Sequence, residues 1–206
     1  MLLRKKEFLR RSIKNFCFFC LTGKFPAGKE SGQIGCVVGA FYTLFLGVML
    51  YAVLWVEHYR TVSLYLEDAL AASNLASAVV DVQEYGISHN ILIDRPEEAY
   101  EIYQWAVRGN LNLNAAWEGQ AGSLVQGPVS IVQYIVYNVK DDEVLVYHFD
   151  EDGQMAQWQE TLGNVAAPNG ILVESTSVYS EIAFETESFF GITVRAHRGN
   201  LADVSR

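Results

Sequence analysis

An uncharged apolar stretch at 34–56 limits what this chain can fold into more than any other feature of its sequence. Its twenty-three residues carry no charged side chain. At about 1.5 Å of rise per residue, a helix of this length spans a hydrocarbon core of about 30 Å. Tyr51 and Trp55 stand near its end, where aromatic side chains favour the membrane interface, and the charged residues Glu57 and Arg60 follow. We therefore predict a membrane-spanning helix over 34–56.

A cleaved secretory signal is the alternative interpretation of this stretch. The apolar part of such a signal is usually about 7 to 15 residues long and precedes a small-x-small cleavage site. The stretch here is longer, and the residues after Val56 contain no convincing site of that kind. A retained membrane anchor is the favoured interpretation.

Charge is divided unevenly on either side of the predicted anchor. Residues 1–56 carry a formal charge of +6 and residues 57–206 carry −15, which together give the net charge of −9. The positive-inside rule then places the N-terminus in the cytoplasm and the acidic part outside it. So acidic a domain also argues against nucleic acid as a partner, because phosphates would repel it. The predicted organisation is a basic cytoplasmic segment or leader over 1–33, the transmembrane helix over 34–56, a helical extension over 57–86 and an extracytoplasmic α+β domain over 87–206.

The segment after the membrane is predicted to continue the same helix. Neither Gly nor Pro occurs between Val48 and Tyr85, and Gly86 is a natural stop. Apolar and small residues recur there at alternating steps of four and three and form a seam that should pack on a domain. The seam consists of Val62, Leu66, Ala69, Ser73, Ala76 and Val80.

The remaining sequence predicts one short helix and an antiparallel sheet of about five strands. Pro96 suits a helix start and Gly109 a helix stop, which gives a helix over 96–108. Runs rich in β-branched and aromatic residues predict the strands, and Asp and Gly residues mark the turns between them. The strands are expected at 129–139 (central in the sheet), 144–149, 154–159 and around Ile182 and Val194. The predicted fold class is α+β, with the long N-terminal helix packed on a small sheet domain.

Within the membrane stretch, four small residues recur every four positions: Gly35, Gly39, Thr43 and Gly47. This spacing places them in one stripe, where the backbone of another helix can approach closely. We interpret the stripe as a helix-packing face. The alternative is that Gly is simply common in membrane helices.

No sequence motif for catalysis, nucleotide binding or zinc binding is found, so we expect neither an enzyme nor a cofactor. The acidic loop around Asp150 and Asp152 resembles part of a calcium loop, but the carboxylates expected at its first and twelfth positions are missing. These two residues are weak metal candidates, and a solvated hairpin turn is the favoured interpretation. An anchored hydrolase would need convergent polar groups such as His148 and Asp150.

A basic leader, an apolar helix that continues beyond the membrane and an antiparallel sheet together resemble the plan of type IV pilins. The ESGQIG run at 30–35, the EDALAASNLA run at 67–76 and the terminal LADV at 201–204 are similar to the TadE and TadG class of pilus-assembly proteins of the tight-adherence system. The resemblance is most specific over 28–86. It implies a pilin-like or pseudopilin-like structural subunit of the bacterial plasma membrane, whose leader is cleaved after Gly28 or Gly32 and which assembles with similar subunits.

The sequence departs from this class at one position. Substrates of the prepilin peptidase carry Glu at the fifth position after the cleaved Gly, whereas counting from Gly28 gives Gln33 and counting from Gly32 gives Val37. An anchored accessory role tolerates this loss better than a major pilin role does. The alternative function is a membrane-anchored extracytoplasmic sensor or binding module.

Overall fold

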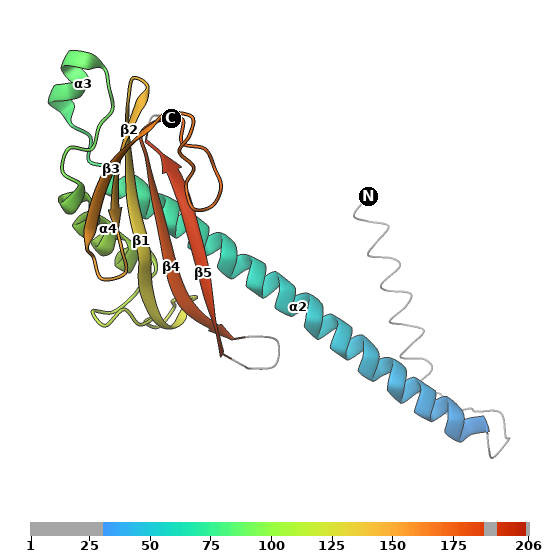
Figure 1. Cartoon of the computed structure of the whole chain (residues 1–206). Helices are drawn as coiled ribbons and strands as arrows, with labels where there is room; N and C mark the ends of the chain where they lie inside the picture. Colours follow the sequence, from blue (N-terminus) through green and yellow to red (C-terminus); the bar gives the residue numbers. More distant parts are fainter. Residues whose placement is uncertain (1–30, 188–192, 205–206) are drawn as a thin grey trace. The chain divides into compact units, whose positions relative to one another are not determined.

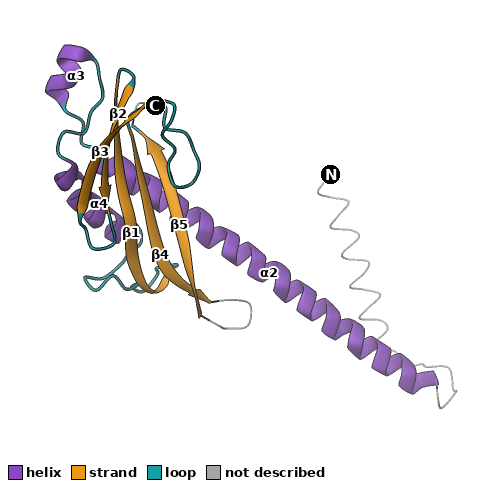
Figure 2. Cartoon of the chain, in the orientation of Figure 1, coloured by secondary structure: helices purple, strands orange, loops and turns teal. Residues whose placement is uncertain are grey.

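In this computed structural model the chain divides into two units, one ending at Val53 and one running from Leu54 to Arg206. The structure describes residues 31–187 and 193–204. Its class is α+β, as predicted (Figures 1 and 2). The described elements are α2 (Ser31–Ser77), α3 (Val82–Ser88), α4 (Pro96–Asn110), β1 (Gln126–Lys140), β2 (Glu143–Phe149), β3 (Met155–Thr161), β4 (Ser177–Glu187) and β5 (Thr193–Asp203).

Helix α2 has 47 residues and contains the whole predicted membrane stretch. From Val37 to Thr61 nearly every side chain is exposed, and only Ala52 and Trp55 are partly covered. Within the described part of the chain, α2 is the one helix long and apolar enough to cross a membrane. Apolar side chains on this scale are stable in lipid and not in water, so α2 is compatible with membrane anchoring.

The predicted helical extension over 57–86 is wrong at its end, because α2 stops at Ser77 and a separate helix, α3, follows. The Ser77 hydroxyl donates to the Asn74 carbonyl at 2.8 Å and competes there with helical bonding. Asp81 then caps α3, since its side-chain oxygen accepts from the Gln83 and Glu84 backbone N–H groups. The absence of Gly and Pro was not sufficient to keep the helix intact.

Burial on α2 begins at Val62 and follows most of the predicted seam. The buried positions after Val62 are Leu66, Ala69, Leu70, Ser73, Asn74 and Ser77. One expectation fails, because Ala76 of the seam is exposed, and Asn74, which does not belong to the seam, is fully buried. The face shifts because Asn74 bonds to the sheet, where its amide donates to the Asn200 carbonyl at 3.0 Å.

The predicted short helix is confirmed as α4. Pro96 is its first residue, and Glu97 and Glu98 occupy the first turn, where the helix dipole favours negative charge. The helix passes Gly109 and ends at Asn110. Its buried face includes Tyr103 and Val107, neither of which is exposed at all.

All five strands form one antiparallel sheet in the order β3-β2-β1-β4-β5. The predicted central strand is confirmed, since β1 lies in the middle and buries Tyr134 on one face and Ile135 on the other. The strands predicted around Ile182 and Val194 are also confirmed as β4 and β5, which pair antiparallel with Glu185 opposite Arg195. Arg195 forms an ion pair with Glu151 at 3.7 Å.

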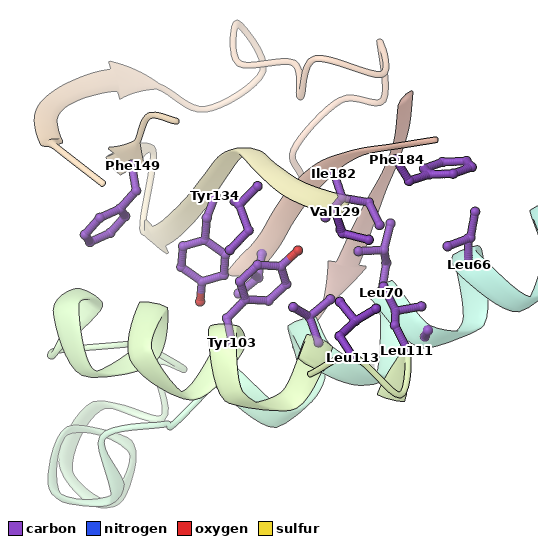
Figure 3. Packing of buried hydrophobic residues seen from close by; sticks show 14 of the residues in the cluster. Leu66, Leu70, Tyr103, Leu111, Leu113, Val129, Tyr134, Phe149, Ile182 and Phe184 are labelled. Atoms are coloured by element: carbon purple, nitrogen blue, oxygen red, sulfur yellow. The ribbon is translucent and has the colours of Figure 1, made fainter. Parts of the chain in front are cut away.

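Each face of the sheet buries its own apolar cluster. On one face, helix α4 and the half of α2 that begins at Val62, here called its outer half, pack against β1, β2 and β4. Leu66 and Leu70 of α2 and Tyr103 of α4 lie next to strand residues such as Tyr134 and Ile182 (Figure 3). On the other face the 162–176 segment covers a smaller cluster that includes residues of β1, β2 and β4. The sheet therefore lies between two layers along part of its length, and its two edge strands are the least covered.

Candidate functional site

The small-residue stripe of α2 forms an open surface. A side-chain carbon added at Gly39 or Gly47 would meet no atom within 4 Å apart from the adjoining backbone of α2 itself. The Thr43 hydroxyl donates to the Gly39 carbonyl, so this polar group is satisfied inside its own helix. The described part of the stripe, Gly39, Thr43 and Gly47, is called the strip below. It is uncharged, and a second helix can pack closely on it without leaving a polar group unpaired.

The other predicted positions of this segment are only partly described. Gly32 and Gly35 have helical backbone at the start of α2. Gly28, the other candidate cleavage position, lies outside the described residues. Cleavage after either glycine stays a prediction.

The acidic loop predicted as a weak metal site is a closed turn between β2 and β3. The Asp150 side-chain oxygen accepts from the backbone N–H of Asp152 at 3.0 Å and of Gln154 at 2.8 Å. Gly153 adopts a φ of +75°, which glycine tolerates best. Among the described residues no group of three or more His, Cys, Asp or Glu side chains could hold a metal ion. The geometry supports a hairpin turn, because the Asp150 carboxylate already satisfies the backbone of its own loop.

The polar pair that a hydrolase would need is not brought together. The His148 ring lies edge-on to Trp158, with ring centroids 6.0 Å apart, and its Nε2 atom is buried without a hydrogen-bond partner. The Asp150 carboxylate accepts hydrogen bonds from the backbone of the turn between β2 and β3. Neither residue is placed to activate a nucleophile.

A polar cluster that the sequence did not reveal surrounds Glu181 of β4. Its carboxylate accepts from Gln133 of β1 at 2.7 Å and from the Tyr179 hydroxyl at 3.4 Å, and lies 3.2 Å from Nδ1 of His197 on β5. Burial, followed by the nearby Glu181 charge, raises the pKa of Tyr179 to about 12. The cluster joins three neighbouring strands through one carboxylate. Only the strand order brings these residues together, and no sequence spacing could have indicated it.

A second polar network lies at the buried end of α2. The Tyr134 hydroxyl donates to Ser77 Oγ at 2.9 Å, and Ser77 donates onward to the Asn74 carbonyl. Tyr103 lies beside Tyr134, with ring centroids 4.8 Å apart. Its hydroxyl is close to that of Ser180, but neither has a partner in hydrogen-bonding geometry. Burial raises the pKa of both tyrosines, so both stay neutral across the physiological range.

This network predicts different changes in the free energy of unfolding for two matched substitutions. Tyr134→Phe removes the hydrogen bond to Ser77 and should lower the free energy of unfolding by about 1 kcal/mol. Tyr103→Phe removes a buried hydroxyl without a partner, so we expect a change within about 0.5 kcal/mol or a slight stabilisation. Urea unfolding of the full chain in detergent, followed by tryptophan fluorescence, measures both. Equal losses for the two variants would contradict the assignment.

An acidic cavity of about 520 Å³ opens between the 81–94 segment and the β2-β3 side of the sheet. Its lining includes the acidic residues Asp81, Glu84, Asp94 and Glu143, together with Lys140 and apolar residues such as Leu145. Ser88 and then Lys140 hydrogen-bond to Glu84 and lower the pKa of its carboxyl. Lys140 is paired with Glu84, and Arg95 lies 3.7 Å from Asp94. Asp81 and Glu143 leave the lining with a net negative charge, which favours a cationic ligand.

Comparison of the chain with protein-family models, with curated proteins and with solved structures finds no match. Its function is therefore argued from the residues and their arrangement.

Proposed function

We propose that this protein is a single-pass membrane protein that serves as a pilin-like structural subunit of a bacterial pilus-assembly or secretion apparatus of the tight-adherence type. In this proposal α2 anchors the chain in the plasma membrane with its N-terminus in the cytoplasm. The sheet domain then lies outside the membrane. The subunit performs no catalysis and meets similar subunits through its membrane helix.

The observation that carries the proposal is that the two halves of α2 differ in burial. One helix supplies an apolar, exposed half of membrane-spanning length and a second half, one face of which is buried against an antiparallel sheet. A chain that needed only an anchor would not require the helix to be continuous with the core of its domain. The exposed strip at Gly39, Thr43 and Gly47 adds a surface on which neighbouring membrane helices can pack.

The packing face is tested by a matched pair of substitutions in the membrane half of α2. Gly39→Leu fills the strip with four added carbon atoms, whereas Ala52→Leu adds three carbon atoms on another side of the helix. We expect Gly39→Leu to reduce co-purified membrane subunits about tenfold, which corresponds to about 1.4 kcal/mol. Ala52→Leu should leave them unchanged. Both variants must insert in the membrane in equal amount, and full recovery of partners with Gly39→Leu would reject the packing face.

Processing of the N-terminus separates two versions of the proposal. The intact mass and N-terminal sequence of the protein from its native membrane would reveal cleavage. A new N-terminus at Lys29 or Gln33 would support a processed, pilin-like subunit. An N-terminus at Met1 would favour a permanently anchored accessory subunit.

A second candidate function is a membrane-anchored binding module, which the acidic cavity favours. Its volume of about 520 Å³ is within the range of small-molecule sites. Such a module would act without other membrane subunits. Purification of the protein alone, with no loss of partners in either α2 variant, would favour this function over the first.

A further inference from the structure

Strand β3 leaves one edge of the sheet unpaired. It pairs only with β2, and all seven of its side chains are exposed. Met155 and Trp158 are each 41 % exposed, and Glu160 is its one charged residue. Edge strands of this kind usually carry Lys, Pro or a bulge that prevents further pairing. The sequence MAQWQET contains no Lys or Pro, and its register with β2 is regular throughout.

The backbone groups on the free edge can be assigned from the pairing with β2. Beyond the two ends of β3, Leu162 N–H donates to the Asp142 carbonyl and Asp150 N–H donates to the Gln154 carbonyl. In an antiparallel pair every second residue exchanges such bonds, so Ala156, Trp158 and Glu160 face β2. The outward N–H groups therefore belong to Met155, Gln157, Gln159 and Thr161. The outward C=O groups that remain free are those of Met155, Gln157 and Gln159, because the Thr161 carbonyl accepts from the Asn164 N–H at 3.2 Å.

The acidic cavity lies beside this free edge. Gln159 of β3 forms part of its wall, together with Leu145 and Tyr147 of β2. Side chains alternate along a strand, so a segment added to β3 would direct every second side chain toward the face that carries Gln159. Those side chains would meet Glu143 and the other carboxylates of the cavity, and a Lys or Arg there would be attracted.

We propose that β3 is a strand-addition site for an extended segment of a partner protein whose Lys or Arg side chains enter the acidic cavity. Main-chain hydrogen bonds would supply affinity and the cavity would supply the preference for basic side chains. A second copy of this chain fits less well. Antiparallel pairing of two β3 strands would bring the acidic turn at 150–152 of one copy against the acidic turn at 141–143 of the other. The site is independent of the packing of α2 in the membrane.

Hydrogen exchange on the full chain tests the site directly. The protein is placed in phosphatidylcholine nanodiscs, whose zwitterionic surface has no net charge to attract a basic probe. The probe is a synthetic peptide of the length of β3 with alternating Lys and Val. We expect saturating peptide to slow exchange about tenfold or more at the amides of Met155, Gln157, Gln159 and Thr161. The amides of Ala156, Trp158 and Glu160 already bond to β2 and should change little.

Two controls act on the probe. N-methylation of alternate peptide amides removes the donors that face β3 and should abolish binding. Replacement of the Lys residues with Glu should do the same through repulsion by the cavity. Equal binding of the Lys and Glu peptides would overturn the role of the cavity, and equal binding of the methylated peptide would overturn strand addition.

Three variants of the chain complete the test. Gln157→Pro removes an outward N–H that β2 does not use, so the sheet should stay intact while peptide binding is lost. Glu143→Gln should weaken binding about fivefold by removing a cavity charge, whereas Glu160→Gln, the same change on the opposite face, should alter it less than about twofold. Unchanged binding by the folded Gln157→Pro variant, or slow exchange at the four outward amides without peptide, would overturn the proposal.

Discussion

Replacing Leu70 with alanine is expected to lower the free energy of unfolding of the sheet-containing unit by about 3 kcal/mol. Leu70 lies on the outer half of α2, is not exposed at all and belongs to the cluster that joins α2 and α4 to the sheet. Truncation removes apolar contacts and leaves a cavity that close-packed neighbours fill only in part. Because Leu70 sits where helix and strands meet, the loss should reduce the stability of the whole unit.

Leu64 provides the matched control on the same helix. Its side chain is 55 % exposed and lies outside the predicted membrane stretch. Leu64→Ala makes the same chemical change with almost no loss of packing, so we expect an effect within about 0.5 kcal/mol. Urea unfolding of both variants in detergent gives the comparison. Similar losses at the two positions would mean that the outer half of α2 does not pack in the core.

Replacing Gly119 with alanine is expected to destabilise the same unit by about 2 kcal/mol, through overpacking. An added Cβ would collide with the Val125 carbonyl oxygen, which is a backbone atom and cannot rotate away. Ser123 lies against the same position at 3.3 Å, so no neighbouring space relieves the collision. The 113–128 connection carries isolated bridges from Leu113 to Gly119 and from Glu118 to Pro128, and these would have to shift.

Gly109 is the control for this substitution. It lies in α4, and an added Cβ would meet nothing within 4 Å. Alanine has the higher helix propensity, so Gly109→Ala should be neutral or stabilise by up to about 1 kcal/mol. Thermal unfolding followed by circular dichroism distinguishes the two variants. A folded Gly119→Ala protein as stable as the parent would contradict the close approach at Val125.

The membrane strip and the β3 edge suggest two separate routes to assembly. The strip at Gly39, Thr43 and Gly47 is uncharged and suits another helix in lipid. The β3 edge is polar, adjoins an acidic cavity and suits an extended basic segment in water. The experiments separate them, since Gly39→Leu leaves β3 intact and Gln157→Pro leaves α2 intact.

The sequence by itself determined the features that depend on local patterns. The uncharged run at 34–56 predicted the one helix, among those described, that is able to cross a membrane, and Pro96 predicted the start of α4. Alternating and β-branched residues predicted five strands, including the central position of β1. These predictions succeed because helix and strand periods, turn residues and membrane length are encoded by neighbours along the chain.

Only the tertiary structure decided where the helix of the sheet-containing unit ends and which polar residues meet. α2 stops at Ser77 because Asn74 and Ser77 are drawn into hydrogen bonds with the sheet and with Tyr134. The Glu181 cluster and the acidic cavity join residues from segments far apart in the chain. Their formation depends on strand order and on the layers over each face. The strand order and the layers depend on how the apolar surfaces of all elements are buried together, so no local sequence pattern predicts them.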